Sequence, residues 1–148
     1  MIVDLLEKYK NKGAFTYKPN EKLSVACNAP TDKAGVYLIY KVIDKEEILI
    51  YIGSSGQANK DGTLKIRKGG MKDRLVNGYH PNRFNEIIRI PRKRAFPKQM
   101  IKVDISQIKI YWWVTYEECI HLDFPTDIET KLRAKYLEFH STMPEWHN

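Results

Sequence analysis

The run from Ile108 to Tyr116 constrains the fold more than any other stretch of the chain. Its sequence, IKIYWWVTY, is rich in β-branched and aromatic residues and is apolar on both faces of an extended chain, which is typical of a strand inside a sheet. Two further runs of this kind lie at 35–43 and 48–52, separated by a charged turn at 44–47. A short turn joins strands in antiparallel order, so we expect a small, mostly antiparallel, three-stranded central sheet.

Helical patterns flank these runs. Residues 2–11 and 126–140 carry apolar side chains at helical spacing, and 71–76 form a short helix after two glycines. We expect Thr126 to be the N-cap of the last helix, and 82–90 to form one or two helical turns. The Gly-, Ser- and Lys-rich residues 53–70 are expected to form a loop. The predicted fold class is therefore α+β, with helices flanking the sheet and a helix at the N-terminus.

The length and the apolar pattern predict one soluble domain. A chain of 148 residues fits a single domain, which we divide into an N-terminal extension (1–33), the strands and helices described above, and a basic insertion (56–102). No apolar run is long enough to span a membrane, and no signal-peptide pattern opens the chain. With only two cysteines, the sequence predicts a cytoplasmic protein with reduced thiols.

Positive charge gathers in one stretch. The net charge is +7, and residues 60–102 hold thirteen Lys and Arg against three acidic residues. Such a block is typical of a surface that binds a polyanion, although a solvated charged face is the alternative. We expect the Arg-Lys-Arg run at 92–94 to lie in irregular backbone that follows phosphates. The residues expected to contact nucleic acid are Lys65, Arg67, Lys68, Lys72, Arg83, Arg89, Arg92, Lys93, Arg94 and Lys98.

Two short motifs in the predicted strands give the strongest functional signal. Gly35-Val36-Tyr37 is followed, after thirteen residues, by Tyr51-Ile52-Gly53, and the pair resembles the signature of the GIY-YIG nuclease superfamily. That family next places an Arg in a helix and a metal-binding Glu in a later helix, matched in order here by Arg74 and Glu129. The ending Pro144-Glu145-Trp146-His147-Asn148 is similar to the family's Pro-Xaa-Trp-Asn.

The long gap between the second motif and Arg74 resembles the restriction-enzyme branch of this family. In that branch a Lys within the gap can assist catalysis, and Lys60 and Lys65 are the local candidates. Arg67 competes with Arg74 for the role of the catalytic Arg, although it lacks the helical context and the following Leu.

The resemblance implies hydrolysis of DNA phosphodiester bonds with one Mg²⁺ or Mn²⁺ ion per site. It implies that Tyr37 is the general base, that Tyr51 orients the water or the phosphate, and that Arg74 holds the scissile phosphate. Glu129 would be the single protein ligand of the ion, whose other ligands are water and phosphate oxygens. A phenol is a poor base at neutral pH, so the role of Tyr37 requires nearby cations.

Structural alternatives remain open for several of these residues. Glu129 fits a capping box with Thr126, in which it would bond the N-cap amide and have no catalytic role. His80 and Asn148 are candidates for supporting the site, but a Tyr-His-Pro loop and a frayed end are the favoured explanations for them.

The leading interpretation is a restriction-type endonuclease of double-stranded DNA, with a homodimer as the form that cuts both strands. One alternative is a catalytically silent nucleic-acid-binding module with this fold. Another is a structure-specific nuclease of repair or mobile elements, or a nuclease that acts on RNA, since the sequence says almost nothing about DNA against RNA.

Overall fold

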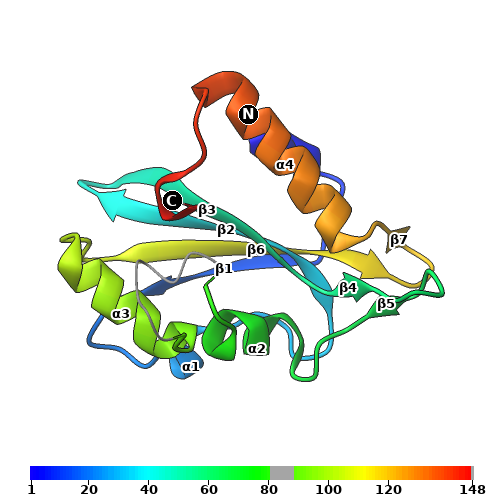
Figure 1. Cartoon of the computed structure of the whole chain (residues 1–148), viewed down its shortest axis with the longest axis horizontal. Coiled ribbons are helices and arrows are strands. Elements are labelled where there is room, and N and C mark those ends of the chain that lie inside the picture. The colour runs from blue at the N-terminus through cyan, green and yellow to red at the C-terminus, as the bar shows by residue number, and fades with distance from the viewer. Residues whose placement is uncertain (81–88, 148) are drawn as a thin grey trace.

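A five-stranded antiparallel sheet forms the centre of the computed structural model, which describes residues 1–80 and 89–147 (Figure 1). The strand order is β1-β6-β2-β3, and β7 pairs with β6. The strands are β1 (Lys12–Tyr17), β2 (Ala34–Ile43), β3 (Glu46–Ser55), β6 (Ile108–Glu117) and β7 (His121–Leu122). The α+β class is confirmed, and the three expected strands form the adjacent set β6-β2-β3, to which β1 and β7 are added.

Strand β6 lies inside the sheet because both of its faces are apolar. Ile110 and Trp112 face one hydrophobic core, and Trp113 faces the other. Its two neighbours, β1 and β2, both pair with it along most of its length. The run at 108–116 therefore has the position that its composition predicts.

Strands β2 and β3 form a tight hairpin. Asp44 and Lys45 both have positive φ, at 49° and 70°, as expected for a two-residue turn whose twist matches that of the flanking strands. The turn is shorter than the expected 44–47: β2 ends at Ile43 as expected, and β3 begins at Glu46, two residues earlier than expected. In the resulting register Tyr37 lies opposite Gly53, which brings the two motif halves side by side.

Helices cover both faces of the sheet (Figure 1). On one face lie α1 (Leu23–Ala26), α2 (Gly70–Asn77) and α3 (Arg92–Lys102); on the other lie α4 (Pro125–His140) and the 3-10 helix η1 (Ile2–Leu6). A C-terminal 3-10 helix, η3 (Glu145–His147), returns to contact β3. Within the described parts of the chain, no helix combines the length and the apolar character needed to cross a membrane.

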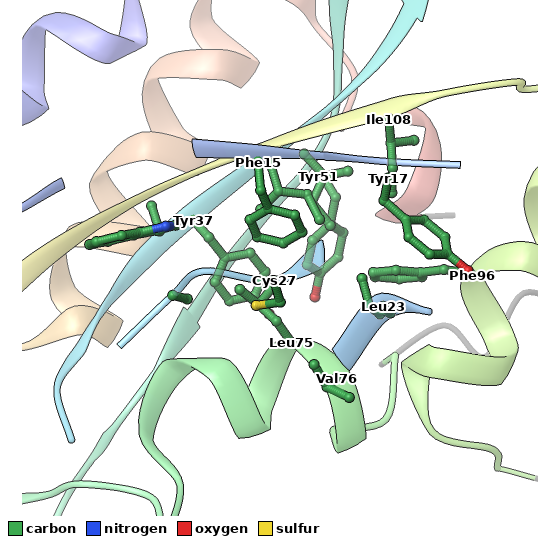
Figure 2. Close-up of a cluster of buried hydrophobic side chains, with 14 of the residues drawn as sticks. Phe15, Tyr17, Leu23, Cys27, Tyr37, Tyr51, Leu75, Val76, Phe96 and Ile108 are labelled. Atoms are coloured by element: carbon green, nitrogen blue, oxygen red, sulfur yellow. The ribbon is translucent and has the colours of Figure 1, made fainter. Parts of the chain in front are cut away.

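Each face of the sheet has its own hydrophobic core. The larger core lies between the sheet and helices α1 to α3, and Figure 2 shows its aromatic rings, including those of Tyr37 and Tyr51, gathered above α2. The smaller core packs Ile128 and Leu132 of α4 against the opposite face. The two motif tyrosines therefore belong to one layer and Glu129 to the other.

Four expectations about local structure were wrong. The expected helix 2–11 is the short η1, and the chain has become strand β1 by Lys12. The expected loop 53–70 contains a small hairpin of β4 (Gln57–Ala58) and β5 (Leu64–Lys65). The N-cap of α4 is Phe124, not Thr126. The helical turns expected at 82–90 fall almost wholly outside the described residues.

The fourth correction concerns the Arg-Lys-Arg run at 92–94. These residues begin helix α3, with Pro91 as its N-cap and Pro97 inside it. Proline is tolerated at a helix start because the backbone N–H that it lacks would have no partner within the helix there. Pro97, in contrast, removes a backbone N–H donor from the helix interior. Arg92 is fully buried, so its expected place on a flexible basic loop was wrong.

Candidate active site

A cleft of about 510 Å³ opens at the edge of strand β3. It gathers three of the four expected catalytic residues and three of the basic residues expected to contact nucleic acid. Its walls are Tyr51, Ser54, Ser55, Gly56, Gln57, Lys65, Arg67, Lys68, Arg74, Thr126, Glu129 and Arg133.

The position of β3 explains how one cleft receives residues from both layers. β3 is at the edge of the main sheet, and successive side chains of a strand point to opposite faces. Tyr51 packs in the core on the α2 side, whereas Ser54 reaches across to Glu129 on α4. An inner strand would have neighbours on both sides, so only the edge lets the two layers meet.

Glu129 is held at the cleft by one hydrogen bond and one ion pair. Ser54 Oγ donates to its Oε1 at 2.5 Å, and Arg133 Nη2 lies 2.7 Å from its Oε2, one helical turn further along α4. No side chain caps the start of α4. The capping-box alternative is therefore wrong: Glu129 faces the cleft and not the amide of Thr126.

Both candidate arginines line the cleft, but their surroundings differ. Arg67 Nε forms an ion pair with Asp73 at 2.6 Å. Arg74 Nη1 donates to the backbone carbonyl of Tyr79 at 3.2 Å, and among the described residues Arg74 has no carboxylate partner. A neutralised guanidinium attracts a phosphate less strongly than one without a counter-charge, which favours Arg74 over Arg67.

Tyr51 lies in the wall of the cleft with its ring stacked on that of His147, at a centroid distance of 4.3 Å. The amide of Ile52 donates to His147 Nε2 at 3.0 Å, so this ring caps a backbone donor of the edge strand. Burial, and then the nearby charge of Arg133, lowers the pKa of His147 to about 4. His147 is therefore a neutral acceptor at physiological pH.

Tyr51 remains protonated in this environment. Burial, the largest cause, raises the pKa of Tyr51 above that of a free phenol, and the neighbouring hydroxyl of Tyr37 adds to the effect. The cations Arg92 and Arg74 lower it, and the carboxylate of Glu129 raises it, but these effects do not overcome burial. Tyr51 can thus donate a hydrogen bond into the cleft but is not a base.

Tyr37 lies directly behind this wall. It is fully buried, and a Cβ added at Gly53 would lie only 2.5 Å from its Cζ. Positions 51, 53 and 55 share one face of β3, so the Tyr37 hydroxyl lies over Gly53 between the cleft residues Tyr51 and Ser55. Its hydrogen-bond donor is Arg92 Nη1, at 2.6 Å.

His80 has a structural place beside the cleft and does not line it. It is 1% exposed, and its Nε2 donates to the carbonyl of Trp146 at 2.6 Å, since a carbonyl oxygen can only accept. Burial, with the charge of Arg92 second, lowers the pKa of His80 to about 3. This neutral His joins α2 to the C-terminal segment and is not an ordinary loop residue.

The remaining basic residues lie mostly outside the cleft. Lys65, Arg67 and Lys68 line it, whereas Lys60 is exposed on the β4–β5 hairpin and Lys72 is partly exposed on α2. The exposed side chains near and on α3 are Arg89, Lys93, Arg94 and Lys98. Arg83 and Asn148 fall outside the described residues.

In and beside the cleft lie residues whose part in it the sequence prediction missed; Ser54 and Arg133 line the cleft, whereas His147 and Arg92 contact its tyrosines from behind. Arg133 follows Glu129 by four positions, a spacing at which opposite charges meet on a helix, so that pair was detectable. Ser54 directly follows the second motif half, and His147 lies in the C-terminal motif. For Arg92 the sequence holds no signal, because its contacts depend on how α3 packs.

Glu129 is the acidic side chain that the cleft offers to a cation. In the described part of the chain, no three His, Cys, Asp or Glu side chains are grouped so as to hold a metal ion. Comparison with known protein families, with curated proteins and with solved structures found no significant match to this chain. The chemistry of the cleft is therefore the basis on which a function is assigned.

Proposed function

We propose that this chain is a metal-dependent endonuclease that hydrolyses phosphodiester bonds of double-stranded DNA, with a GIY-YIG-type site and a restriction role in the cytoplasm. The observation that carries the proposal is the convergence of Tyr51, Arg74 and Glu129 on one cleft rimmed with lysine and arginine. These residues come from a strand and two helices on opposite faces of the sheet, and together they supply a donor, a phosphate-binding cation and a metal ligand.

The carboxylate of Glu129 fits a hard divalent cation such as Mg²⁺ or Mn²⁺. Its Oε1 accepts one hydrogen bond and its Oε2 forms one ion pair, so each oxygen keeps a lone pair for a cation. A single carboxylate suits one ion that takes its other ligands from water and phosphate. When bound, the ion supplies positive charge to the phosphate and the leaving oxygen. Arg133 competes for the same carboxylate, so the ion must displace or share it.

The chain's own residues have separate tasks in this proposal. Arg74 binds the scissile phosphate, which a guanidinium can hold through two parallel hydrogen bonds. Tyr51 donates to a phosphate oxygen or to the attacking water. Tyr37 accepts the proton of that water once DNA binding moves the side chains that separate it from the cleft, since catalytic contacts in unliganded sites are often longer than in the complex.

Incubation of the protein with supercoiled plasmid and Mg²⁺ tests this proposal, with EDTA and Glu129→Ala as the inactive arms. Glu138→Ala is the matched control, because it removes an exposed glutamate from the same helix. We expect discrete linear fragments that require both Mg²⁺ and Glu129, and nearly unchanged duplex binding by Glu129→Ala in EDTA.

Nicking without linear fragments would indicate a single-strand or structure-directed nuclease. Salt-sensitive DNA binding without cleavage of plasmids from several sources would contradict the proposal and favour the silent binding module. Cleavage of RNA in preference to DNA would correct the substrate. Light scattering on cognate DNA tests the homodimer, which a monomeric complex would contradict.

A further inference from the structure

Arg92 is a buried cation in the larger core. Its side chain is 0% exposed, and among the described residues no carboxylate pairs with it. Desolvating a guanidinium is expensive unless its hydrogen bonds and its charge are satisfied. An apolar residue of similar length would suit this core better, so stability alone does not account for an arginine here.

One nitrogen of Arg92 joins two residues of the proposed site. Nη1 donates to Tyr37 Oη at 2.6 Å and to the backbone carbonyl of Arg74 at 3.1 Å. Because a guanidinium has donors only, the phenol oxygen must be the acceptor. The proton of Tyr37 is therefore directed away from Arg92, and the oxygen lies against a fixed positive charge.

The rest of the guanidinium is only partly compensated. Nε and Nη2 are buried and have no hydrogen-bond partner within residues 1–80 and 89–147. The Cζ atom lies 5.3, 5.6 and 5.7 Å from the ring centroids of Tyr37, Tyr51 and Phe96, within the range of cation–π attraction. Unsatisfied buried donors in a fold require an explanation. Here they belong to the same guanidinium that donates to Tyr37, the proposed base.

We propose that Arg92 is the positioning residue of this site: through Nη1 it fixes the Tyr37 hydroxyl relative to the backbone of Arg74. This inference rests on the proposed nuclease function, which supplies the roles of Tyr37 and Arg74. Arg92 does not line the cleft, so it acts on the substrate only through these two residues.

Arg92→Met and Arg92→Lys test the inference in single-turnover cleavage assays at saturating enzyme. Met removes the charge and both hydrogen bonds, so we expect the cleavage rate to fall about 100-fold or more, the range of a general-base contribution. Lys keeps the charge but not the rigid fork, so its rate should lie between those of Met and Arg.

Two further measurements separate positioning from structure. Thermal unfolding of Arg92→Met should occur at the wild-type temperature or above it, because an incompletely satisfied buried charge is removed. Its duplex affinity in EDTA should equal that of the wild type. Lys10→Met, which removes an exposed cation outside the basic stretch 60–102, is the matched comparison and should change neither the duplex affinity nor the saturated rate.

The outcomes are distinguishable. A wild-type enzyme that cuts DNA, with an Arg92→Met variant that cuts as fast, overturns this inference and leaves the nuclease proposal intact. A large fall in the unfolding temperature of both Arg92 variants assigns Arg92 a structural role and overturns it too. A wild-type protein that cuts nothing overturns the nuclease proposal first and the inference with it. Full activity in Arg92→Lys would show that charge suffices and overturn the bridging role.

Discussion

At the scale of single residues, Gly53 shows how a missing side chain makes room for a functional one. The Tyr37 ring occupies the space that a Cβ at Gly53 would need, with contacts of 2.5 Å to Cζ and 2.6 Å to Oη. The edge strand can therefore approach the ring only if this position is glycine. The second motif half therefore needs glycine at position 53 because the Tyr37 ring of the first half occupies the space beside it.

Gly53→Ala should destabilise the fold by about 1–3 kcal/mol, the usual range for an overpacked core. It should also reduce cleavage, because Tyr37 must move. Urea unfolding measures the first effect and the plasmid assay the second. Gly62→Ala is the control: a Cβ there meets nothing within 4 Å, and only the positive φ of 86° disfavours it, so about 1 kcal/mol is expected. Equal losses in activity would contradict the steric explanation.

His147 should make the fold sensitive to acid. The pKa of His147 is about 4 in the folded protein, against 6.5 for an ordinary His, so below pH 6.5 the unfolded chain binds more protons than the folded one. Stability is full above pH 6.5 and falls as the pH approaches 4. His80, with a pKa of about 3, continues the decline to lower pH.

Urea unfolding between pH 7 and pH 4 measures this dependence. His147→Gln retains an acceptor for the Ile52 amide but cannot be protonated in this range, so it should lose less stability on acidification than the wild type. His140→Gln, at the exposed end of α4, should keep the wild-type dependence. Identical pH profiles for wild type and His147→Gln would contradict the assignment.

Site residues that belong to a family motif can be predicted from the sequence, whereas residues whose role depends on tertiary contacts cannot. Tyr51, Arg74 and Glu129 could be predicted because a family resemblance specifies their order along the chain, and all three line one cleft. Arg92 could not, because a basic run predicts exposure and its burial is decided by the tertiary packing of α3. The choice between cap and cleft for Glu129 likewise depends on Ser54, a contact between distant parts of the chain.

At the scale of elements, helix α3 forms although its sequence opposes it. Pro97 lies inside the helix, where it removes one hydrogen bond and clashes with the preceding turn. The buried residues Phe96 and Met100 anchor this helix in the larger core, and that burial outweighs the low propensity.

Pro97→Ala should therefore stabilise the protein. Alanine regains the missing hydrogen bond, worth up to about 3 kcal/mol in helix propensity, less about 0.4–1 kcal/mol for the greater freedom of the unfolded chain. Chemical unfolding measures the gain, and Gln99→Ala on the same helix controls for the general effect of alanine. A loss of stability would mean that the proline ring is itself a packing contact that the helix requires.

Element prediction succeeded where one physical signal dominated. The runs at 35–43 and 108–116 are strongly apolar and form strands β2 and β6, as predicted. Strand β1 was missed because Lys12–Tyr17 is short and mixed in composition, and only pairing with β6 makes it a strand. The hairpin of β4 and β5 was missed for the same reason, since two-residue strands carry no periodicity.

At the scale of the whole molecule, the positive charge and the cleft coincide in part. Lys65, Arg67 and Lys68 lie at the cleft, whereas Lys93 and Arg94 are exposed on α3. The location of a basic block can be read from composition, but its division between a cleft and a remote surface depends on the fold.

Binding to duplex DNA should weaken steeply with salt, because each phosphate contact releases condensed counterions. Lys68→Ala should lower the slope of log affinity against log salt by about 0.9, the value for one contact. Lys10→Ala, exposed before strand β1, is the control and should leave the slope unchanged. Fluorescence anisotropy in EDTA at several salt concentrations measures both, and equal slopes in the two variants would exclude Lys68 from the interface.

The cleft at the edge of β3 is shared between two cores on opposite faces of the sheet. If Glu129 binds a metal ion as proposed, substitutions in the core beneath α4 should change its setting, and hence metal preference, more than the packing of Tyr37 and Tyr51. Substitutions beneath α2 and α3 do the reverse. A protein engineer could therefore select variants with a different metal preference and variants with a different catalytic rate from two separate libraries. The selected substitutions could then be combined, because they lie on opposite faces of the sheet.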